Sequence, residues 1–271
     1  MRTVTKGRST LEVGLVGAGS NVLRLVRKWL APIADPRLVV AGARGYPGYA
    51  ADWRRYARLP QAEPIRFRDA HPQLHDRTTT TAIDPHYFYS NGWAIRRILA
   101  QPTRRHVDVG SQTVFANLLG ATVPVVFVDY RPVVARLSGL HSVGASLLNL
   151  PFRDRSVPSL SCLHVIEHVG LGRYGDALDP MGTRKAMAEL SRVLAVGGNL
   201  FVAIPVGQSR LCFNAHRIHE VAAIRAMAPD LDLVEFSGVT DDGDYVEQVP
   251  VHAFDRSQYA CGLFWFRRGQ A

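Results

Sequence analysis

The second half of the chain is organised by short apolar runs that alternate with stretches of helical periodicity. Four runs rich in β-branched residues are strand candidates, each followed by a turn signal or a helical pattern: residues 106–110, 125–129, 160–164 and 199–205. Residues 181–198 have the periodicity of a helix that a glycine pair closes. Residues 231–239 and 259–268 fit two further strands, and the last is a candidate for an antiparallel edge. This alternation predicts an α/β domain with a mostly parallel, doubly wound sheet covered by helices on both faces.

Residues 11–45 combine two apolar runs with a helical pattern between them. The runs are 11–19 and 37–45, and the stretch 20–35 places apolar side chains on one helical face: Val22, Leu23, Val26 and Leu30. Two interpretations stay open for this segment. It forms a strand, a helix and a second strand, or it forms one basic amphipathic helix between loops.

Residues 46–80 have no sustained periodicity and are rich in Pro, Arg, Gln and Thr, so we expect irregular structure there. Residues 84–99 then indicate a turn that leads into a helix. These patterns predict two parts, an N-terminal extension over 1–83, which caps the pocket or mediates association, and a ligand-binding domain over 84–271.

Composition and charge support this division. With 271 residues, 47% hydrophobic and 20% charged, the chain is long enough to bury a full core, which excludes a disordered or fibrous protein. Residues 1–105 hold 18 basic and 7 acidic side chains, whereas residues 106–271 hold 14 and 16. The net charge of +9 therefore belongs to a basic arm. Its aromatic residues form no stacking motif, so we predict no nucleic-acid partner. An anionic membrane surface, contacted through residues 22–30, and a second copy of the chain stay open as partners of the arm.

The remaining composition bears on localisation. The three cysteines lie far apart without a C-x-x-C spacing, which favours a reducing compartment. No apolar run reaches the length of about 20 residues that a membrane-spanning helix needs. Glu12 interrupts the apolar run that would otherwise resemble a signal peptide. We expect a cytoplasmic protein, with peripheral contact to the inner face of the membrane as the alternative.

Candidate ligand-binding residues follow the first two strands of the body. Gly110 ends the first strand, and Asp129 ends the second about 20 residues later, which is the usual spacing of a phosphate-approach glycine and a ribose-binding acid. From these residues alone two interpretations stay open, since Gly110 also fits a tight turn and Asp129 a helix cap.

A longer series of motifs resembles class I S-adenosylmethionine-dependent methyltransferases. An L-P-F turn at 150–152, an H-V-x-E-H stretch at 164–168 and an E-x-x-R-V-L-x-x-G-G helix at 189–198 follow in that family's order. More narrowly, four segments resemble a branch of uncharacterised methyltransferase-like domains associated with glycan biosynthesis: 84–89, 106–111, 160–180 and 213–217. The resemblance, which covers roughly residues 84 to 266, implies a Rossmann-like fold with seven strands and S-adenosylmethionine as cofactor.

The resemblance also assigns roles, although the chain departs from the family in places. Of the D-x-G-x-G-x-G turn only Asp108 and Gly110 match, and Asn149 replaces an acid. The residues implied for the cofactor are Asp108, Gly110, Ser111, Asp129, Tyr130, Ser146, Leu147 and His164. Those implied for catalysis and acceptor binding are His168, His216 and Asp176, and Arg173, Tyr174 and Arg217. A histidine suits the general base that a weakly acidic hydroxyl needs. The implied reaction is O-methylation of a sugar hydroxyl in a glycan or a glycan precursor.

Parts of the sequence are compatible with three other functions. Residues 164–168 match the H-x-x-E-H pattern of zinc proteases, but they follow a predicted buried strand rather than lying on a helix, so we predict no metal site. Gly17 and Gly19 imitate an NADP-binding turn, yet Val22 takes the third glycine position, and the oxidoreductase stays the weaker enzyme class. A non-catalytic scaffold that kept the methyltransferase-like fold is the remaining hypothesis.

Overall fold

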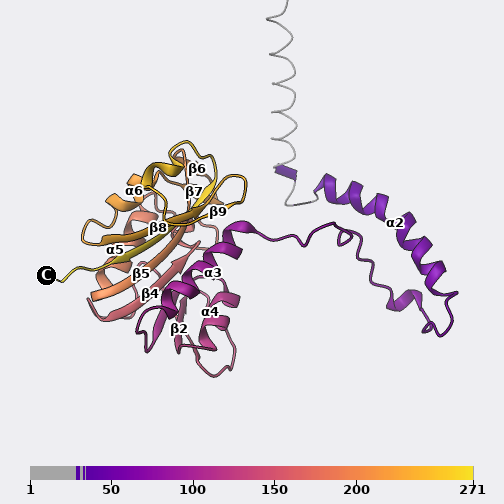
Figure 1. Cartoon of the computed structure of the whole chain (residues 1–271), viewed down its shortest axis with the longest axis horizontal. Helices are drawn as coiled ribbons and strands as arrows, with labels where there is room; N and C mark the ends of the chain where they lie inside the picture. The colour runs from indigo at the N-terminus through magenta and orange to yellow at the C-terminus, as the bar shows by residue number, and fades with distance from the viewer. Residues whose placement is uncertain (1–28, 31–32, 34, 271) are drawn as a thin grey trace, which may run out of the picture. The chain divides into compact units, whose positions relative to one another are not determined.

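The computed structural model describes residues 29–30, 33 and 35–270 (Figure 1). The chain divides into two units, residues 1–82 and 83–271. The first apolar run, the glycine motif at Gly17 and most of the amphipathic helix predicted around Val22 to Leu30 lie outside the described residues.

The first unit contains one long helix where a second strand was one of the two expectations. Helix α2 spans Pro36–Tyr56 and continues through Pro47, and the short helix η1 spans Phe67–Asp69. The strand interpretation of 37–45 is therefore wrong, and so is the irregular structure expected for 46–56. No described strand of this unit is available to pair with 37–45, and an isolated strand is unstable in water. Arg77 forms an ion pair with Asp52 on α2 at 2.6 Å.

The second unit is built on one mixed sheet. Its strands are β1 (His106–Val109), β2 (Val125–Asp129), β3 (Leu140–Gly144), β4 (Val157–Leu163), β5 (Leu194–Val206), β8 (Asp232–Val239), β9 (Tyr245–Val246) and β10 (Ala260–Arg267). Their order is β3-β2-β1-β4-β5-β10-β8-β9, and the first five are parallel. The order reverses between β1 and β4, which is where ligands bind in such sheets. The predicted Rossmann-like α/β class is confirmed, with one more strand than expected because the short β9 pairs with β8.

Strand β10 corrects one expectation. It is antiparallel as proposed, but it lies inside the sheet between β5 and β8 rather than at an edge. Six of its eight residues are buried, including Leu263, Phe264 and Phe266. The side chains of β10 are buried on both faces, so the strand needs a packed layer on each face of the sheet, and its position between β5 and β8 provides both.

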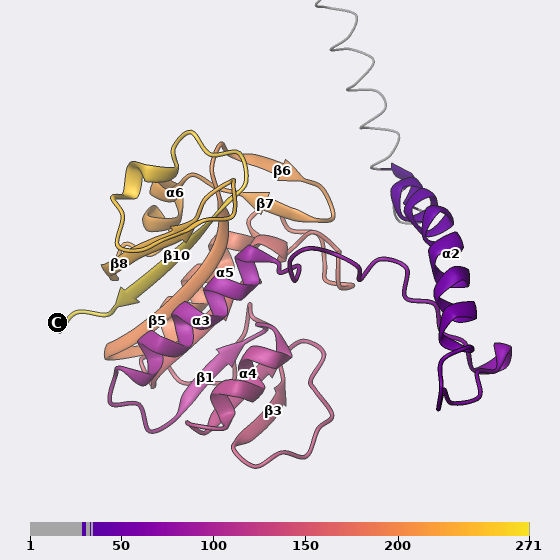
Figure 2. The same ribbon diagram turned by 45° about the vertical axis from the view of Figure 1, so that its right-hand side comes forward.

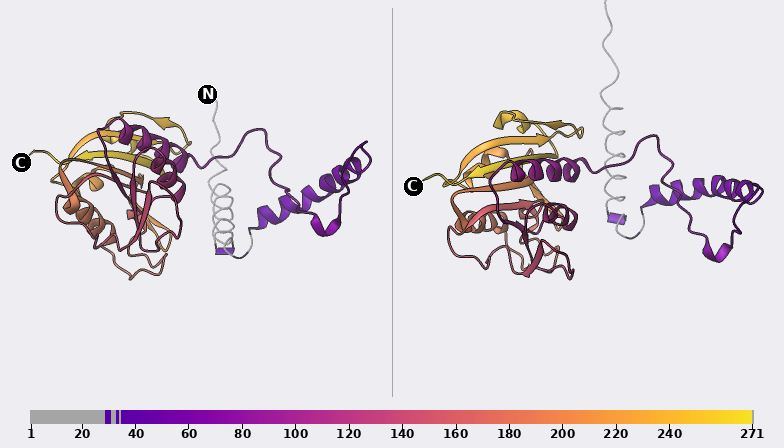
Figure 3. Two further views of the ribbon diagram at one scale, coloured as in Figure 1. Left: turned by 90° about the horizontal axis from the view of Figure 1, so that it is seen from below. Right: turned by 60° about the horizontal axis from the view of Figure 1, so that its bottom comes forward.

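Helices cover both faces of the sheet (Figures 2 and 3). Helices α3 (Pro85–Leu99) and α4 (Thr113–Gly120) bury Trp93 and Phe115 against one face. Helices α5 (Gly182–Val193) and α6 (Val221–Ala226) bury Met187 and Ile224 against the other. The remaining elements are the hairpin β6 (Arg210–Cys212) and β7 (His216–Ile218), and the short helices η2 (Ile166–His168) and η3 (Val251–Phe254). No described helix is both long and apolar enough to cross a membrane.

Asp84 fixes the start of α3. Its carboxylate accepts hydrogen bonds from the backbone N–H groups of His86 and Tyr87, and Pro85 occupies the first helical position. Both features are typical of a helix N-terminus. The cap therefore determines where the first two rings of α3 lie, beside the carboxyl end of β4.

Candidate functional site

A cavity of about 340 Å³ opens at the carboxyl ends of β1, β2 and β4. Of the site residues predicted from the sequence, nine line it: Gly110, Asp129, Tyr130, Ser146, Leu147, His164, His168, Tyr174 and Asp176. Ser111 lines a neighbouring cavity that shares Gly110 and Asp129 with the first. Asp108 is buried beneath the cavity, and the lining of these two cavities does not include Arg173, His216 or Arg217.

Gly110 and Asp129 face each other across the floor of the cavity. Gly110 has a φ of +69°, and a Cβ atom there would lie 3.0 Å from Val165 Cγ1 and 3.7 Å from Asp129 Oδ2. Asp129 Oδ1 accepts a hydrogen bond from the Arg131 N–H at 2.7 Å, which orients the carboxylate. Oδ2 receives no hydrogen bond from the described residues and is the free acceptor on the Gly110 side. A ribose with two hydroxyl donors fits this arrangement.

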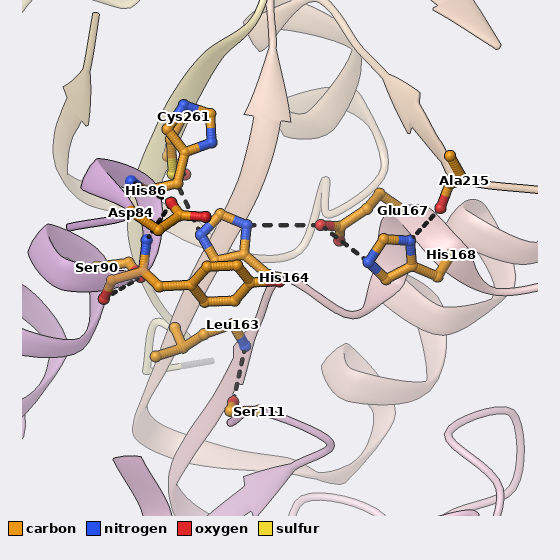
Figure 4. Close-up of polar contacts among 12 residues, drawn as sticks. Asp84, His86, Ser90, Ser111, Leu163, His164, Glu167, His168, Ala215 and Cys261 are labelled. Atoms are coloured by element: carbon orange, nitrogen blue, oxygen red, sulfur yellow. Dashed lines mark hydrogen bonds and ion pairs between the residues drawn. The ribbon is translucent and has the colours of Figure 1, made fainter. Parts of the chain in front are cut away.

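A buried polar network supports the Gly110 turn from below. Asp108 accepts hydrogen bonds from the Ser111 hydroxyl at 2.6 Å and from the Ser161 hydroxyl. The Ser111 hydroxyl also accepts the Leu163 N–H, which joins β1 to β4 (Figure 4). Burial outweighs these hydrogen bonds and raises the pKa of Asp108 to about 7.

His106 extends the same network. Its two ring nitrogens lie 2.8 Å from the Ser159 and Ser161 hydroxyls. Since Ser161 donates to Asp108, Nε2 of His106 carries the proton and Nδ1 accepts from Ser159. Burial lowers the pKa of His106 to about 3, so the ring stays neutral. This residue was not among those predicted from the sequence.

The loop after η2 closes one side of the cavity. Asp176 Oδ2 accepts the Gly170 N–H at 2.6 Å, and the Arg217 guanidinium donates to the carbonyls of Val169 at 2.6 Å and Asp179 at 2.9 Å. These contacts commit the side chains of Asp176 and Arg217 to holding the loop. Arg217 is only 9% exposed, so the acceptor contact proposed for it competes with its role in the loop.

Tyr174 lies in the same loop between two guanidinium groups. Arg131 lies 4.7 Å and Arg173 lies 5.2 Å from the centre of its ring. Arg173 also donates to the Ala215 carbonyl at 3.1 Å. The Tyr174 ring is 42% exposed, so it borders the cavity and remains accessible to an acceptor.

Two histidines share one buried carboxylate at the end of β4 (Figure 4). Glu167 Oε1 lies 3.6 Å from His164 Nδ1 and 3.7 Å from His168 Nε2. On His168, Nδ1 lies 2.5 Å from the Ala215 carbonyl and therefore carries a proton, which leaves the lone pair on Nε2. Burial lowers the pKa of His168, although Glu167 opposes the shift. The neutral ring is in the form that accepts a proton.

Rings from distant segments surround this pair. His216 lies 6.5 Å from His168, and Tyr259, at the start of β10, lies 5.1 Å from His216. His86 and Tyr87 of α3 lie 5.9 Å and 4.6 Å from His164 (centroid distances). Nothing local in the sequence indicates that Tyr259 belongs to the site, because its position depends on β10 lying next to β5.

The described residues contain no group of three or more His, Cys, Asp or Glu side chains arranged to hold a metal ion. The H-x-x-E-H segment forms η2 and the turn before it, with His164 at a φ of +58°, rather than a continuous α-helix. This geometry differs from the helical one that the zinc-protease pattern requires.

Known proteins are similar to this chain in one segment and in fold. Residues 155–254, less than half of the chain, match a family model described as Caenorhabditis protein of unknown function, DUF268. No curated protein sequence matches the chain. The N-methyltransferase NodS from Bradyrhizobium japonicum WM9, in complex with S-adenosyl-L-homocysteine, has a TM-score of 0.50 at 13% identity, over 81% of this chain and 98% of that one.

A second solved structure gives the same result. A putative sarcosine dimethylglycine methyltransferase from Galdieria sulphuraria has a TM-score of 0.50 at 12% identity, over 67% of this chain and 86% of that one. At these identities the similarity shows the fold alone. The domain has the Rossmann-like fold of class I S-adenosylmethionine-dependent methyltransferases.

Proposed function

We propose that the protein is an S-adenosylmethionine-dependent O-methyltransferase that acts on a sugar hydroxyl of a glycan or glycan precursor. The observation that carries the proposal is a single cavity that contains both Gly110 with Asp129 and the ring of His168. The first pair suits the cofactor, and the histidine suits removal of a proton. The sugar as acceptor rests on the resemblance of residues 163–180 and 213–217 to domains associated with glycan biosynthesis.

The residues present fit the cofactor. A side chain at position 110 would project toward Asp129 and Val165, so glycine keeps this part of the cavity open. Asp129 would hold the ribose hydroxyls through its free Oδ2, and Ser146 and Leu147 would lie against the adenine. When bound, S-adenosylmethionine supplies a methyl group that its sulfonium already activates.

The chain itself must position the acceptor, exclude water and remove a proton. Nε2 of His168 is suited to the last task, because the Ala215 carbonyl holds the proton of the ring on Nδ1. Glu167, at 3.7 Å, stabilises the imidazolium that forms when Nε2 takes the hydroxyl proton. His216 is the alternative base, and burial lowers its pKa as well.

Cofactor binding is tested by calorimetry with S-adenosylmethionine and S-adenosylhomocysteine. We expect binding by the unmodified protein, and we expect Asp129→Ala to weaken it by about tenfold or more, since a hydrogen-bonded carboxylate contributes about 1.5 to 3 kcal/mol. Asp242→Ala, which removes an exposed carboxylate outside the cavity, is the matched control. Absence of binding, or equal affinities for the wild-type protein and Asp129→Ala, would overturn the cofactor assignment.

Turnover is tested with a panel of nucleotide sugars and free glycosides, using radiolabelled methyl transfer and mass spectrometry of the product. His168→Gln should lower kcat by about 10² to 10⁴ while cofactor affinity stays unchanged. An unchanged kcat in His168→Gln would remove His168 as the base. Cofactor binding without transfer to any member of the panel would favour the non-catalytic scaffold.

A further inference from the structure

Glu167 is a buried carboxylate that the cavity does not expose to solvent. Its side chain is 1% exposed, and Oε2 has no hydrogen-bond partner among the described residues. Among the described side chains, the donors near Oε1 are the rings of His164 and His168, at 3.6 Å and 3.7 Å. An uncompensated buried carboxylate is costly, so at least one of these rings must carry a compensating proton.

The partners of the two rings decide where that proton resides. His168 already donates from Nδ1 to Ala215, so a second proton on Nε2 would make the ring cationic beside Arg173, whose Nη1 lies 3.3 Å from Nδ1. His164 has no such cation at its other nitrogen, because Nε2 lies 3.6 Å from Cys261 Sγ (Figure 4). The resident proton therefore belongs to His164.

The electrostatics agree with this geometry. Burial alone would lower the pKa of His164, but Cys261 and Glu167 together raise it to about 10. Burial lowers the pKa of His168, and both Arg173 and His164 lower it further. Two neighbouring groups whose environments push their pKa values apart are suited to different roles in proton transfer.

We propose that Glu167 is a positioning residue that keeps a proton on His164 and so reserves Nε2 of His168 for the proton that the acceptor releases. This inference rests on the proposed function and deepens it. Glu167 contacts neither cofactor nor acceptor in this scheme. It compensates the resident charge of His164 at all times and the transient charge of His168 during proton transfer.

Cys261 also raises the pKa of His164, so Glu167 shares this role with one of the other titratable and charged groups that surround it. They come from α3, β4, the loop after η2, the β6–β7 hairpin and β10, and they are His86, Tyr87, Cys162, Arg173, Tyr174, His216, His219, Tyr259 and Cys261. Burial lowers the pKa of His86, His216 and His219 and so keeps these rings neutral. Burial raises the pKa of Tyr87, and that of Tyr259 to about 12, so neither phenol ionises near neutral pH.

The test is a titration of the full chain labelled with ¹⁵N-histidine, in which ring nitrogen shifts report the protonation of each histidine. His164→Gln and His168→Gln assign the two signals. In the wild-type protein His164 should stay an imidazolium at pH 8, while His168 is neutral at pH 7 with its proton on Nδ1. In Glu167→Gln the pKa of His164 should fall by at least about one pH unit, because an opposite charge at this distance is removed. Glu167→Asp should retain part of the shift.

Glu220→Gln, which neutralises an exposed carboxylate, is the control and should leave both rings unchanged. A neutral His164 in the wild-type protein at pH 7 would overturn the proposal even if Glu167→Gln does not fold. An unchanged His164 titration in Glu167→Gln would overturn it equally. Since the titration needs neither cofactor nor acceptor, its outcome is separate from the success of the proposed reaction.

Where turnover is measurable, a second readout separates positioning from a structural role. Glu167→Gln should lower kcat by about tenfold or more and leave the affinity for S-adenosylhomocysteine unchanged, and Glu167→Asp should recover part of the rate. A loss of cofactor affinity that parallels the loss of kcat would instead indicate a collapsed cavity and would contradict the positioning role.

Discussion

Two buried groups beneath the cavity should give this domain opposing pH dependences of stability. His106 and Asp108 lie in one hydrogen-bonded network through Ser161. Burial lowers the pKa of His106 from 6.5 to about 3 and raises that of Asp108 from 3.8 to about 7. Burial therefore favours the neutral form of both groups, but His106 becomes charged as the pH falls and Asp108 becomes charged as the pH rises.

The signs follow from proton uptake in the two states. Between about pH 4 and 6.5 the unfolded chain protonates His106 while the folded chain does not, so this histidine makes the free energy of unfolding rise with pH. In the same window the folded chain keeps Asp108 protonated while the unfolded chain does not, so the aspartate makes it fall. Each effect amounts to about 3 kcal/mol over the window, at 1.36 kcal/mol per pH unit. They nearly cancel in the wild-type protein.

Substituting one of the two residues should make the pH dependence of stability that the other contributes measurable. His106→Gln keeps a donor for Ser161 and an acceptor for Ser159 but cannot ionise, so its stability relative to wild type should fall by about 3 kcal/mol from pH 4 to 6.5. Asp108→Asn should show a relative rise of similar size, and the double variant should follow the wild type. A change of about 3 kcal/mol moves a urea midpoint by about 1 M or more, which equilibrium denaturation at several pH values resolves.

The control is His141→Gln, which removes an exposed imidazole on β3 and should follow the wild-type curve. If the curves of His106→Gln and the wild type stay parallel within about 1 kcal/mol, burial does not hold His106 neutral and the proposed tautomer of the network is wrong. If the double variant departs from the wild type by more than either single variant, the two groups do not act as opposing terms.

Two further substitutions probe the turn and the anchor of α3. Gly110→Ala places a Cβ at a φ of +69° and should lower the stability by about 1 to 2 kcal/mol and weaken the affinity for S-adenosylmethionine. Gly92→Ala on α3 is the control and should lower neither. Urea denaturation measures the stability and calorimetry the affinity, and normal cofactor binding by Gly110→Ala would contradict the close approach of the cofactor to the backbone. The Glu235 side chain is 6% exposed and accepts hydrogen bonds from Trp93 and Arg97, so Glu235→Gln should lower the free energy of unfolding by about 3 kcal/mol. The Glu247 side chain is 49% exposed, so Glu247→Gln should lower it by less than about 1 kcal/mol. Equal losses of stability in the two variants would refute the role of Glu235 as a buried anchor of α3.

Four of the parallel strands were predictable from the local sequence, whereas β3, which has no buried residue, was not among the predicted strands. β1, β2, β4 and β5 are apolar runs followed by turns, and parallel strands buried on both faces require such runs. The order of the strands is not a local property. The apolar run of β10 predicts a buried strand, but only its pairing with β5 and β8 shows that it lies inside the sheet rather than at an edge.

Helix α2 is an element whose type the local sequence did not determine. Residues 37–45 contain the β-branched pair Val39 and Val40 followed by two glycines, a pattern that suits a short strand. A strand, however, is stable only with a partner, whereas a helix satisfies its own backbone hydrogen bonds. Where the described part of the first unit offers no partner strand, the helix is the remaining solution despite Pro47.

The site residues that lie at the carboxyl ends of predicted strands could be predicted from the sequence. Those that only the fold brings to the site could not. Gly110, Asp129 and His168 each follow a strand, and the carboxyl ends of parallel strands meet at one edge. Tyr259 lies next to His216, and Cys261 next to His164, only because β10 lies in the middle of the sheet. No spacing in the chain encodes that proximity.

Ser111 has a structural role in the turn that departs from the family's glycine-rich pattern. In the sequence it occupies a variable position of the D-x-G-x-G-x-G turn, just before Gln112, which stands where the second glycine would be and suggests a poorer approach of the backbone to the cofactor. In the structure its hydroxyl turns away from the cavity, donates to Asp108 and accepts the Leu163 N–H, and the side chain is 4% exposed. The position that needs a positive φ next to Asp129 is still a glycine, Gly110. The serine therefore ties the turn to β4 without entering the cavity, which argues that the turn has exchanged backbone freedom for rigidity while keeping the space that a cofactor requires.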